Sequence, residues 1–177
     1  MYPNRKEDGY GLKIQHLEEM KAKGVKLVIT VDCGITSIEE AFYAKTIGID
    51  VIITDHHQPL NELPQAVAVI DPLCSPQYPF KGLAGVGVAF KLINALLTKS
   101  TFDKKKKNQI FNFFLPIVAI GTVADVVPLL DENRYIVKKG LEVINRFPER
   151  LPPSLKGFLS YLNIKSPVDT YHIGFII

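Results

Sequence analysis

The sequence is poor in cysteine and in long apolar stretches. Only two of its 177 residues are cysteines, Cys33 and Cys74, and neither belongs to a Cys-x-x-Cys pair, which argues against a zinc cluster. No apolar stretch approaches the roughly 20 residues that a membrane-spanning helix needs. The amino-terminal residues carry no apolar signal core either. We therefore expect a cytoplasmic protein that does not bind a membrane.

Charge of one sign is not in large excess. The chain has 21 Lys and Arg against 18 Asp and Glu, so its net charge is only +3. That balance is compatible with an anionic substrate but does not by itself indicate one. With 47% hydrophobic and 22% charged residues the chain can bury a core, and its length fits one domain.

Three apolar runs in the first half of the chain each end at an aspartate. The runs cover residues 26–31, 50–54 and 66–70, and the aspartates are Asp32, Asp55 and Asp71. Unbroken apolar runs of this length suit strands that are buried on both faces of a parallel sheet. A helix is predicted over 38–47, between the first two runs. The predicted fold class is α/β, a parallel β-sheet flanked by helices, with a largely helical second half.

The remaining predicted elements are mostly helices. A helix over 12–21 would carry His16 on its surface. Pro116 should kink or break the helix expected over 109–123. The last residues, 171–177, are expected to form a strand or a linker. The other predicted helices cover residues 86–97, 133–145 and 153–162.

The polar residues at the strand ends predict a metal site. Ligands of open parallel sheets bind beyond the carboxyl ends of the strands, and sequential strands are usually neighbours. Asp32 should then lie beside the Asp55-His56-His57 run, although a lone aspartate at a strand end is often only a turn former. Carboxylate oxygen and imidazole nitrogen are ligands of Mn²⁺ or Zn²⁺. Successive residues leaving a strand point in different directions, so one histidine would bind metal while the next faces substrate.

Asp125 is a further candidate ligand, in the apolar segment 119–128. An unpaired buried carboxylate is costly, so a partner is expected. A metal ion is one candidate and Arg134 is the other. Three carboxylates and two histidines would suit two metal ions a few ångströms apart, an arrangement that serves in-line displacement at phosphorus. Oxygen-rich ligation favours Mn²⁺ or Mg²⁺.

Two other segments leave alternatives open. The glycine-rich residues 82–87 could hold a phosphate at a helix N-terminus or serve close packing of a helix on the sheet. The lysine run at 104–107 is interpreted as a solvated loop between helices. Its functional alternative is contact with a phosphate backbone.

Three of these segments resemble motifs of the DHH phosphoesterases. They are 31–37 (Val-Asp-Cys-Gly-Ile-Thr-Ser), 53–57 (Ile-Thr-Asp-His-His) and 121–125 (Gly-Thr-Val-Ala-Asp). Flanking segments narrow the resemblance to the single-strand-specific 5′→3′ DNA exonucleases of this family. Those segments lie at residues 3–5, 9–12, 83–89, 133–134 and 138–141. The resemblance runs along nearly the whole chain.

The resemblance implies a role for each site residue. Asp32 would bridge two Mn²⁺ or Mg²⁺ ions, and His56 and Asp125 would complete the shell of one of them. His57 would face the scissile phosphate, and Asp55 would orient the histidines as a hydrogen-bond acceptor behind them.

The resemblance also implies how the chain compares with a whole member of that family. Arg5 would hold a terminal phosphate of the DNA through its forked guanidinium. The sequence begins after the family's first, aspartate-rich motif, so residues 1–165 are expected to be an incomplete catalytic domain. Residues 166–177 would start a linker towards a further domain. One of the two metal sites would then be incomplete, and we expect little or no nuclease activity and marginal stability from the chain alone.

The implied function is that of a metal-dependent phosphodiesterase, a single-stranded-DNA-specific exonuclease of DNA repair and recombination. Its partners would be single-stranded DNA and, as candidates, repair or single-strand-binding proteins. Two alternatives stay open at this point. The chain could act on oligoribonucleotides, cyclic dinucleotides or pyrophosphate, or it could be a non-catalytic relative that binds single strands.

Overall fold

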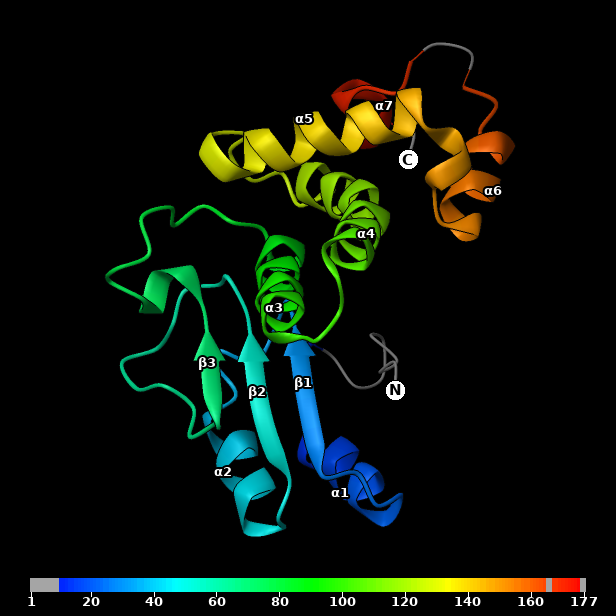
Figure 1. The fold of residues 1–177 in the computed structure, drawn as a ribbon. Helices are drawn as coiled ribbons and strands as arrows, with labels where there is room; N and C mark the ends of the chain where they lie inside the picture. Colours follow the sequence, from blue (N-terminus) through cyan, green and yellow to red (C-terminus); the bar gives the residue numbers. More distant parts are fainter. Residues whose placement is uncertain (1–9, 165–166, 176–177) are drawn as a thin grey trace. The chain divides into compact units, whose positions relative to one another are not determined.

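The structure is a computed structural model that describes residues 10–164 and 167–175. The chain divides into two compact units, residues 1–81 and 82–177 (Figure 1). None of the helices in the described part of the chain has the length and apolar character that a membrane crossing requires.

The first unit contains the predicted parallel sheet. Its strands are β1 (Leu27–Val31), β2 (Asp50–Thr54) and β3 (Ala68–Ile70). They lie in the order β1-β2-β3, and both pairings are parallel. Val31 is in register with Thr54, and Thr54 with Ile70, so the three strands end at the same level.

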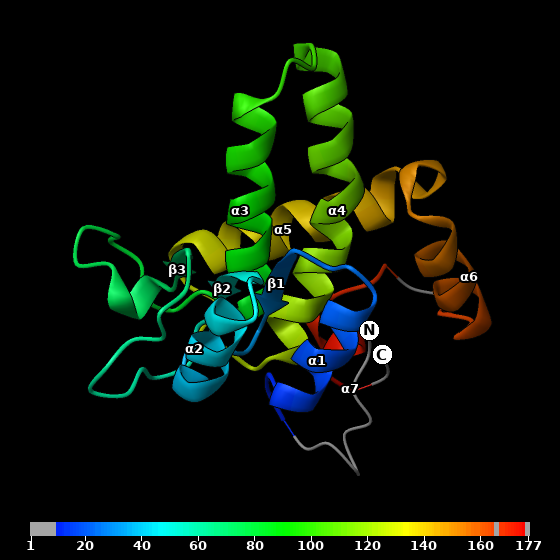
Figure 2. The same cartoon turned by 90° about the horizontal axis from the view of Figure 1, so that it is seen from below.

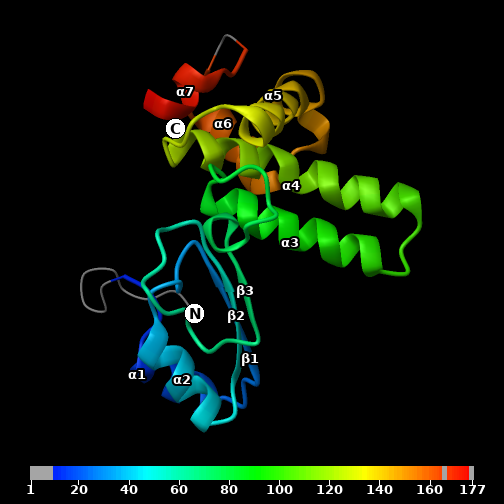
Figure 3. The ribbon, with the colours of Figure 1, turned by 90° about the vertical axis from the view of Figure 1, so that its left-hand side faces the viewer.

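Two helices, α1 (Ile14–Ala22) and α2 (Ile38–Thr46), lie together on one face of this sheet (Figure 3). They enclose a core whose buried residues include Leu17, Ala44 and Ile53. His16 is buried next to Leu17, so its predicted place on the helix surface is wrong.

The prediction that both faces of the first strand are buried is also wrong. Side chains alternate along a strand. Val28 packs against the helix-covered core, whereas Leu27, Ile29 and Val31 on the other face are between 45% and 52% exposed.

The second unit is helical, as predicted. Figure 2 shows α3 (Gly85–Lys99) and α4 (Lys104–Ala124) as an antiparallel pair. Next come α5 (Asp131–Arg146), the short 3₁₀ helix η2 (Pro148–Arg150) and α6 (Pro153–Tyr161). A second core contains buried residues from α5 and α6, among them Ile144 and Leu155.

Two expectations for α4 need correction. The lysine run at 104–107 is not a loop but the first turn of this helix, because Asp103 caps it: Asp103 Oδ1 accepts the Lys106 N–H at 2.7 Å. The helix also continues through Pro116, so of the predicted kink or break the break does not occur. Pro116 is buried between residues that face α5, so tertiary packing outweighs its local preference.

The C-terminal segment contains a helix, not the expected strand. Helix α7 spans Thr170–Phe175. Asp169 precedes it, and its Oδ1 accepts the His172 N–H at 3.0 Å, the hydrogen bond of an N-cap. Ile173 is buried in the core that α5 and α6 share.

Candidate metal centre

An aspartate follows each of the three strands, and the three lie in a row. The hydrogen-bond ladder extends one residue beyond the strand ends, because Asp32 N–H donates to Thr54 O at 2.9 Å and Asp55 N–H donates to Ile70 O at 3.1 Å. Neighbouring strands are about 4.8 Å apart. Asp32, Asp55 and Asp71 are therefore neighbours along one edge of the sheet.

Asp32, His56 and His57 form a cluster that is suited to a metal ion. One possible ligand atom from each of the three lies within 4.8 Å of the others. His56 Nε2 is 3.1 Å from Asp32 Oδ1, and the two imidazole rings have centroids 4.5 Å apart. The side chain of His56 is 14% exposed and that of His57 is 48% exposed. The inner histidine thus lies against the carboxylate, and the outer one is open to a substrate.

Asp55 supports the two histidines of the cluster through hydrogen bonds. It is 1% exposed. Its Oδ2 accepts the Ile35 N–H at 2.9 Å, and its Oδ1 accepts the His56 N–H at 2.8 Å and lies 2.7 Å from His57 Nδ1. Burial alone would raise the pKa of this carboxyl, but these hydrogen bonds outweigh burial and hold the pKa below its usual value. The ionised carboxylate fixes both histidines.

The turn after β1 brings the Ile35 N–H to Asp55. Asp32 has a φ of 61° and Gly34 a φ of 108°, both in the left-handed region. A side chain at Gly34 would place a Cβ 2.8 Å from Thr30 Oγ1, which donates to Cys33 O at 2.7 Å. Only glycine fits there. Asp32 is not a glycine, so its positive φ costs free energy. Such backbone strain often accompanies functional sites.

Tyr10 contacts this cluster, and the sequence analysis missed it as a site residue. Its hydroxyl donates to Asp32 O and lies 3.4 Å from His57 Nδ1. Its ring meets the His57 ring edge-on, with centroids 5.8 Å apart. The only signal in the sequence was its place between two glycines, Gly9 and Gly11, in a segment that resembles the family.

Asp71 is a buried carboxylate that interacts electrostatically with Asp55 and the two histidines, and the sequence analysis did not single it out. It is 3% exposed, its Oδ1 accepts the Leu73 N–H at 2.8 Å, and its buried Oδ2 has no hydrogen-bond partner within residues 10–164 and 167–175. Burial raises the pKa of this carboxyl, and the charge of Asp55 raises it further. The sequence did hold a signal for it: like Asp32 and Asp55, Asp71 directly follows an apolar run.

Asp71→Asn should stabilise the metal-free chain at neutral pH. The raised pKa means that the folded state disfavours ionised Asp71, so wild-type stability falls as pH rises above the ordinary carboxyl pKa of about 4. Asparagine keeps the acceptor for Leu73 N–H and cannot ionise. In a chelator, we expect the thermal midpoint of the variant to exceed that of wild type by a few degrees at pH 7, and the difference to vanish towards pH 3. A difference that grows towards acidic pH would contradict this assignment.

Asp125 and Arg5 are not part of the described cluster. Asp125 belongs to the second unit, where it ends α4 with its N–H bonded to Gly121 O at 3.0 Å. Its side chain is exposed, so the expected burial of this carboxylate is wrong. The next residue, Val126, has a φ of 58°, which is strained for a β-branched side chain. Arg5 lies outside the described residues.

Comparison with known proteins shows which family has sequences similar to this chain. The family model "DHH family, N-terminal domain" matches residues 1–122. The single-stranded-DNA-specific exonuclease RecJ of Salmonella typhimurium is 42% identical over 198 residues, covering 98% of this chain and 34% of the relative. RecJ of Bacillus subtilis is 48% identical over 147 residues, covering 81% of this chain and 17% of the relative. The chain thus spans about a third or less of the length of these relatives.

Solved structures agree with this grouping. A crystal structure of exonuclease RecJ bound to manganese matches with a TM-score of 0.81 and 32% identity, over 98% of this chain and 41% of that chain. RecJ in complex with Mn²⁺ from Thermus thermophilus matches with a TM-score of 0.71 and 28% identity, over 92% of this chain and 23% of that one. The family model alone covers more than half of the sequence, and the chain therefore belongs to the DHH family.

Proposed function

We propose that this chain carries the metal centre of a single-stranded-DNA-specific 5′→3′ exonuclease, a metal-dependent phosphodiesterase that acts in DNA repair and recombination. One observation carries the proposal: Asp32, His56 and His57 meet at the carboxyl edge of a parallel sheet with their ligand atoms within 4.8 Å. The relatives that share this sequence are named as exonucleases specific for single-stranded DNA.

The donor atoms of the cluster fit Mn²⁺ or Mg²⁺. Carboxylate oxygen suits both ions, and the imidazole nitrogens favour Mn²⁺ over Mg²⁺, because Mg²⁺ prefers oxygen ligands. Asp32 and His56 would hold the ion, with Asp32 able to bridge to a second one. A bound ion would supply Lewis-acid stabilisation of charge at phosphorus. His57 contacts Asp55 through Nδ1, and its side chain is 48% exposed, so its ring would face the scissile phosphate.

Asp125 is proposed to complete the shell of the metal held by Asp32 and His56. A carboxylate at the C-terminal end of a helix faces the negative pole of the helix dipole, which is unfavourable without a cation. The strained Val126 directly after it is a second sign that function constrains this position. A bound divalent ion would offset the unfavourable interaction between the Asp125 carboxylate and the helix dipole.

The same proposal covers the substrate contact, the domain bounds, the partners and the cellular location of the whole protein. Arg5 would hold a terminal phosphate of the substrate strand. Residues 1–165 would belong to the catalytic domain, and 166–177 would begin a linker. The partners would be single-stranded DNA and repair or single-strand-binding proteins, and the protein would act in the cytoplasm.

The direct test is Mn²⁺ binding by calorimetry, because it does not depend on parts that the longer relatives have in addition. We expect the chain to bind Mn²⁺ and His56→Ala to bind it at least 100-fold more weakly, since a ligand is removed. Asp125→Ala should weaken binding by 10-fold or more if this carboxylate completes the shell.

Asp50→Ala is the matched control. Asp50 is an exposed carboxylate at the opposite end of β2, so its removal should leave Mn²⁺ affinity unchanged. A folded wild-type chain that binds no Mn²⁺ would rule out the proposed metal centre. If Asp125→Ala does not change Mn²⁺ affinity, Asp125 is not a ligand, and the metal centre consists of the cluster of Asp32, His56 and His57 without it.

A further inference from the structure

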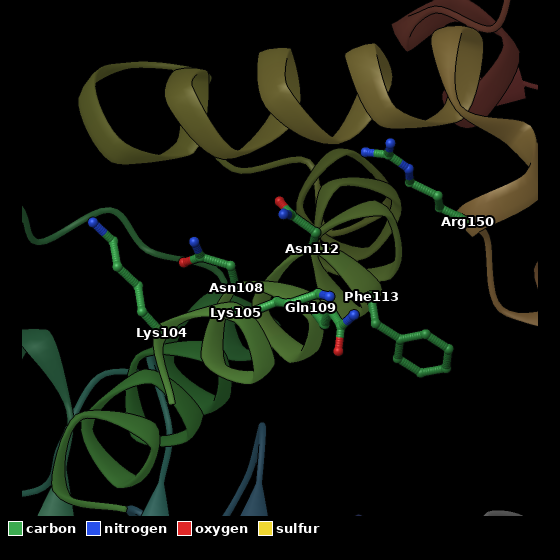
Figure 4. A pocket seen from close by; sticks show the side chains of 7 residues that line it. All are labelled: Lys104, Lys105, Asn108, Gln109, Asn112, Phe113 and Arg150. Carbon is green, nitrogen blue, oxygen red and sulfur yellow. The ribbon is translucent and has the colours of Figure 1, made fainter. Parts of the chain in front are cut away.

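We propose that the second unit contains a binding groove for single-stranded nucleic acid, formed by the N-terminal half of α4 and Arg150. This inference rests on the proposed function only in the class of its ligand. It concerns the pocket shown in Figure 4, which has a volume of about 810 Å³.

The groove is cationic. Lys104, Lys105 and Arg150 line it, and no acidic side chain does. Throughout the described residues, neither of these lysines forms an ion pair with a carboxylate. Arg150 is paired with Glu149 through Nε at 3.3 Å, but both side chains are more than 60% exposed, so this pair is weak and leaves the terminal guanidinium nitrogens for other acceptors.

The position of the lysines is unfavourable for the helix itself. Lys104–Lys107 occupy the first turn of α4, where the helix dipole is positive and acidic residues would be stabilising. The four adjacent cations repel both the dipole and one another, and the Asp103 carboxylate at the N-cap offsets only part of this positive charge. An anion bound at the groove would remove this repulsion, and a phosphate backbone supplies one at each nucleotide.

The rest of the groove suits bases as well as phosphates. Asn108, Gln109 and Asn112 contribute amide groups along the same exposed side of α4. The ring of Phe113 is 41% exposed at the far end, where a base can stack on it. Lys105 and Phe113 are eight residues apart, which is about 12 Å of helix. Stacked nucleotides of one strand rise about 3.4 Å each along the strand axis, so this length accommodates about three nucleotides.

Arg150 is held in place on the other side of the groove. Its guanidinium carbon lies 4.4 Å from the centroid of the Phe147 ring, a cation–π contact. Figure 4 shows it approaching from a segment separate from α4. Cations from two segments together with amides and an exposed aromatic ring favour a nucleic-acid strand over an acidic peptide, because each nucleotide supplies both a phosphate and a base that can stack on Phe113.

Fluorescence anisotropy with a labelled oligothymidylate tests the groove. A chelator is present throughout, so neither cleavage nor a metal bridge contributes. We expect Lys104→Gln/Lys105→Gln to bind about 10-fold more weakly at low salt. The slope of log affinity against log salt should fall by about 0.7 for each phosphate that the variant no longer neutralises. Phe113→Leu should weaken binding between about 5-fold and about 100-fold, because an aliphatic side chain cannot stack on a base.

The control is Lys23→Gln/Lys156→Gln, which removes the same charge from two exposed lysines that do not line the groove. Circular dichroism confirms that each variant is folded. Equal weakening by the control pair would overturn the groove in favour of general charge attraction. An unaffected Phe113→Leu combined with displacement of the oligonucleotide by polyglutamate would overturn it in favour of an acidic peptide. Loss of Mn²⁺ binding with intact groove binding would contradict the proposed function and not the groove.

Discussion

Asp55→Ala should be the most damaging single substitution in the first unit, with a loss of about 3–5 kcal/mol of unfolding free energy. The variant leaves the buried N–H group of Ile35 and the partly buried N–H group of His56 without their acceptor, and it removes the contact that holds the His57 ring. Each buried donor that loses its acceptor costs about 1–3 kcal/mol. Mn²⁺ affinity should also fall by about 10- to 100-fold, because the histidines are no longer oriented.

Urea unfolding and calorimetry measure the two effects separately. Asp50→Ala, on the exposed start of the same strand, should change stability by less than about 0.5 kcal/mol. Asp55→Asn should fall between wild type and alanine, because the amide accepts at one position and presents an N–H group to a donor at the other. A stable Asp55→Ala variant with unchanged Mn²⁺ affinity would mean that Asp55 does not hold the cluster.

Gly140→Ala should destabilise the second unit by about 3 kcal/mol or more. Gly140 lies where α5 crosses α4, and an added Cβ would overlap Ala119 Cβ and lie 2.9 Å from Leu115 O. The carbonyl belongs to the backbone and cannot rotate away, so the two helices would have to separate. Thermal or urea unfolding gives the loss directly.

A double-mutant cycle tests whether the helix crossing is the cause. Ala119→Gly removes one of the two overlaps and should restore part of the stability lost in Gly140→Ala, although glycine in a helix costs about 1 kcal/mol. Gly157→Ala is the control, since a Cβ there meets nothing within 4 Å and should raise stability by about 0.5–1 kcal/mol. Additive effects of the substitutions at 119 and 140 would argue against a shared contact.

The parts of the fold that local patterns determine were predictable. β2 has the predicted bounds, 50–54, and β1 begins one residue later than predicted. Apolar runs bounded by turn residues specify strands, and the parallel arrangement follows from the helix between them. The same reasoning placed Asp32 next to His56, because both follow neighbouring strands.

Other features depend on tertiary contacts that a single sequence does not display. Pro116 and the lysine run at 104–107 both lie inside α4, since packing against α5 and the Asp103 cap outweigh local preference. Tyr10 reaches the cluster from 22 residues before Asp32, a contact that only the folded chain creates. The burial of Asp71 likewise depends on β3 pairing with β2.

The row of aspartates at the strand ends has a consequence for engineering this protein. Because side chains alternate along a strand, deleting or inserting one residue within β1 or β2 turns every later residue of that strand to the opposite face. The aspartate at its end would then leave the row even though no catalytic residue had been changed. Libraries that vary which apolar residues fill the strands should retain many members with the three aspartates in a row, whereas libraries that vary strand length should retain almost none.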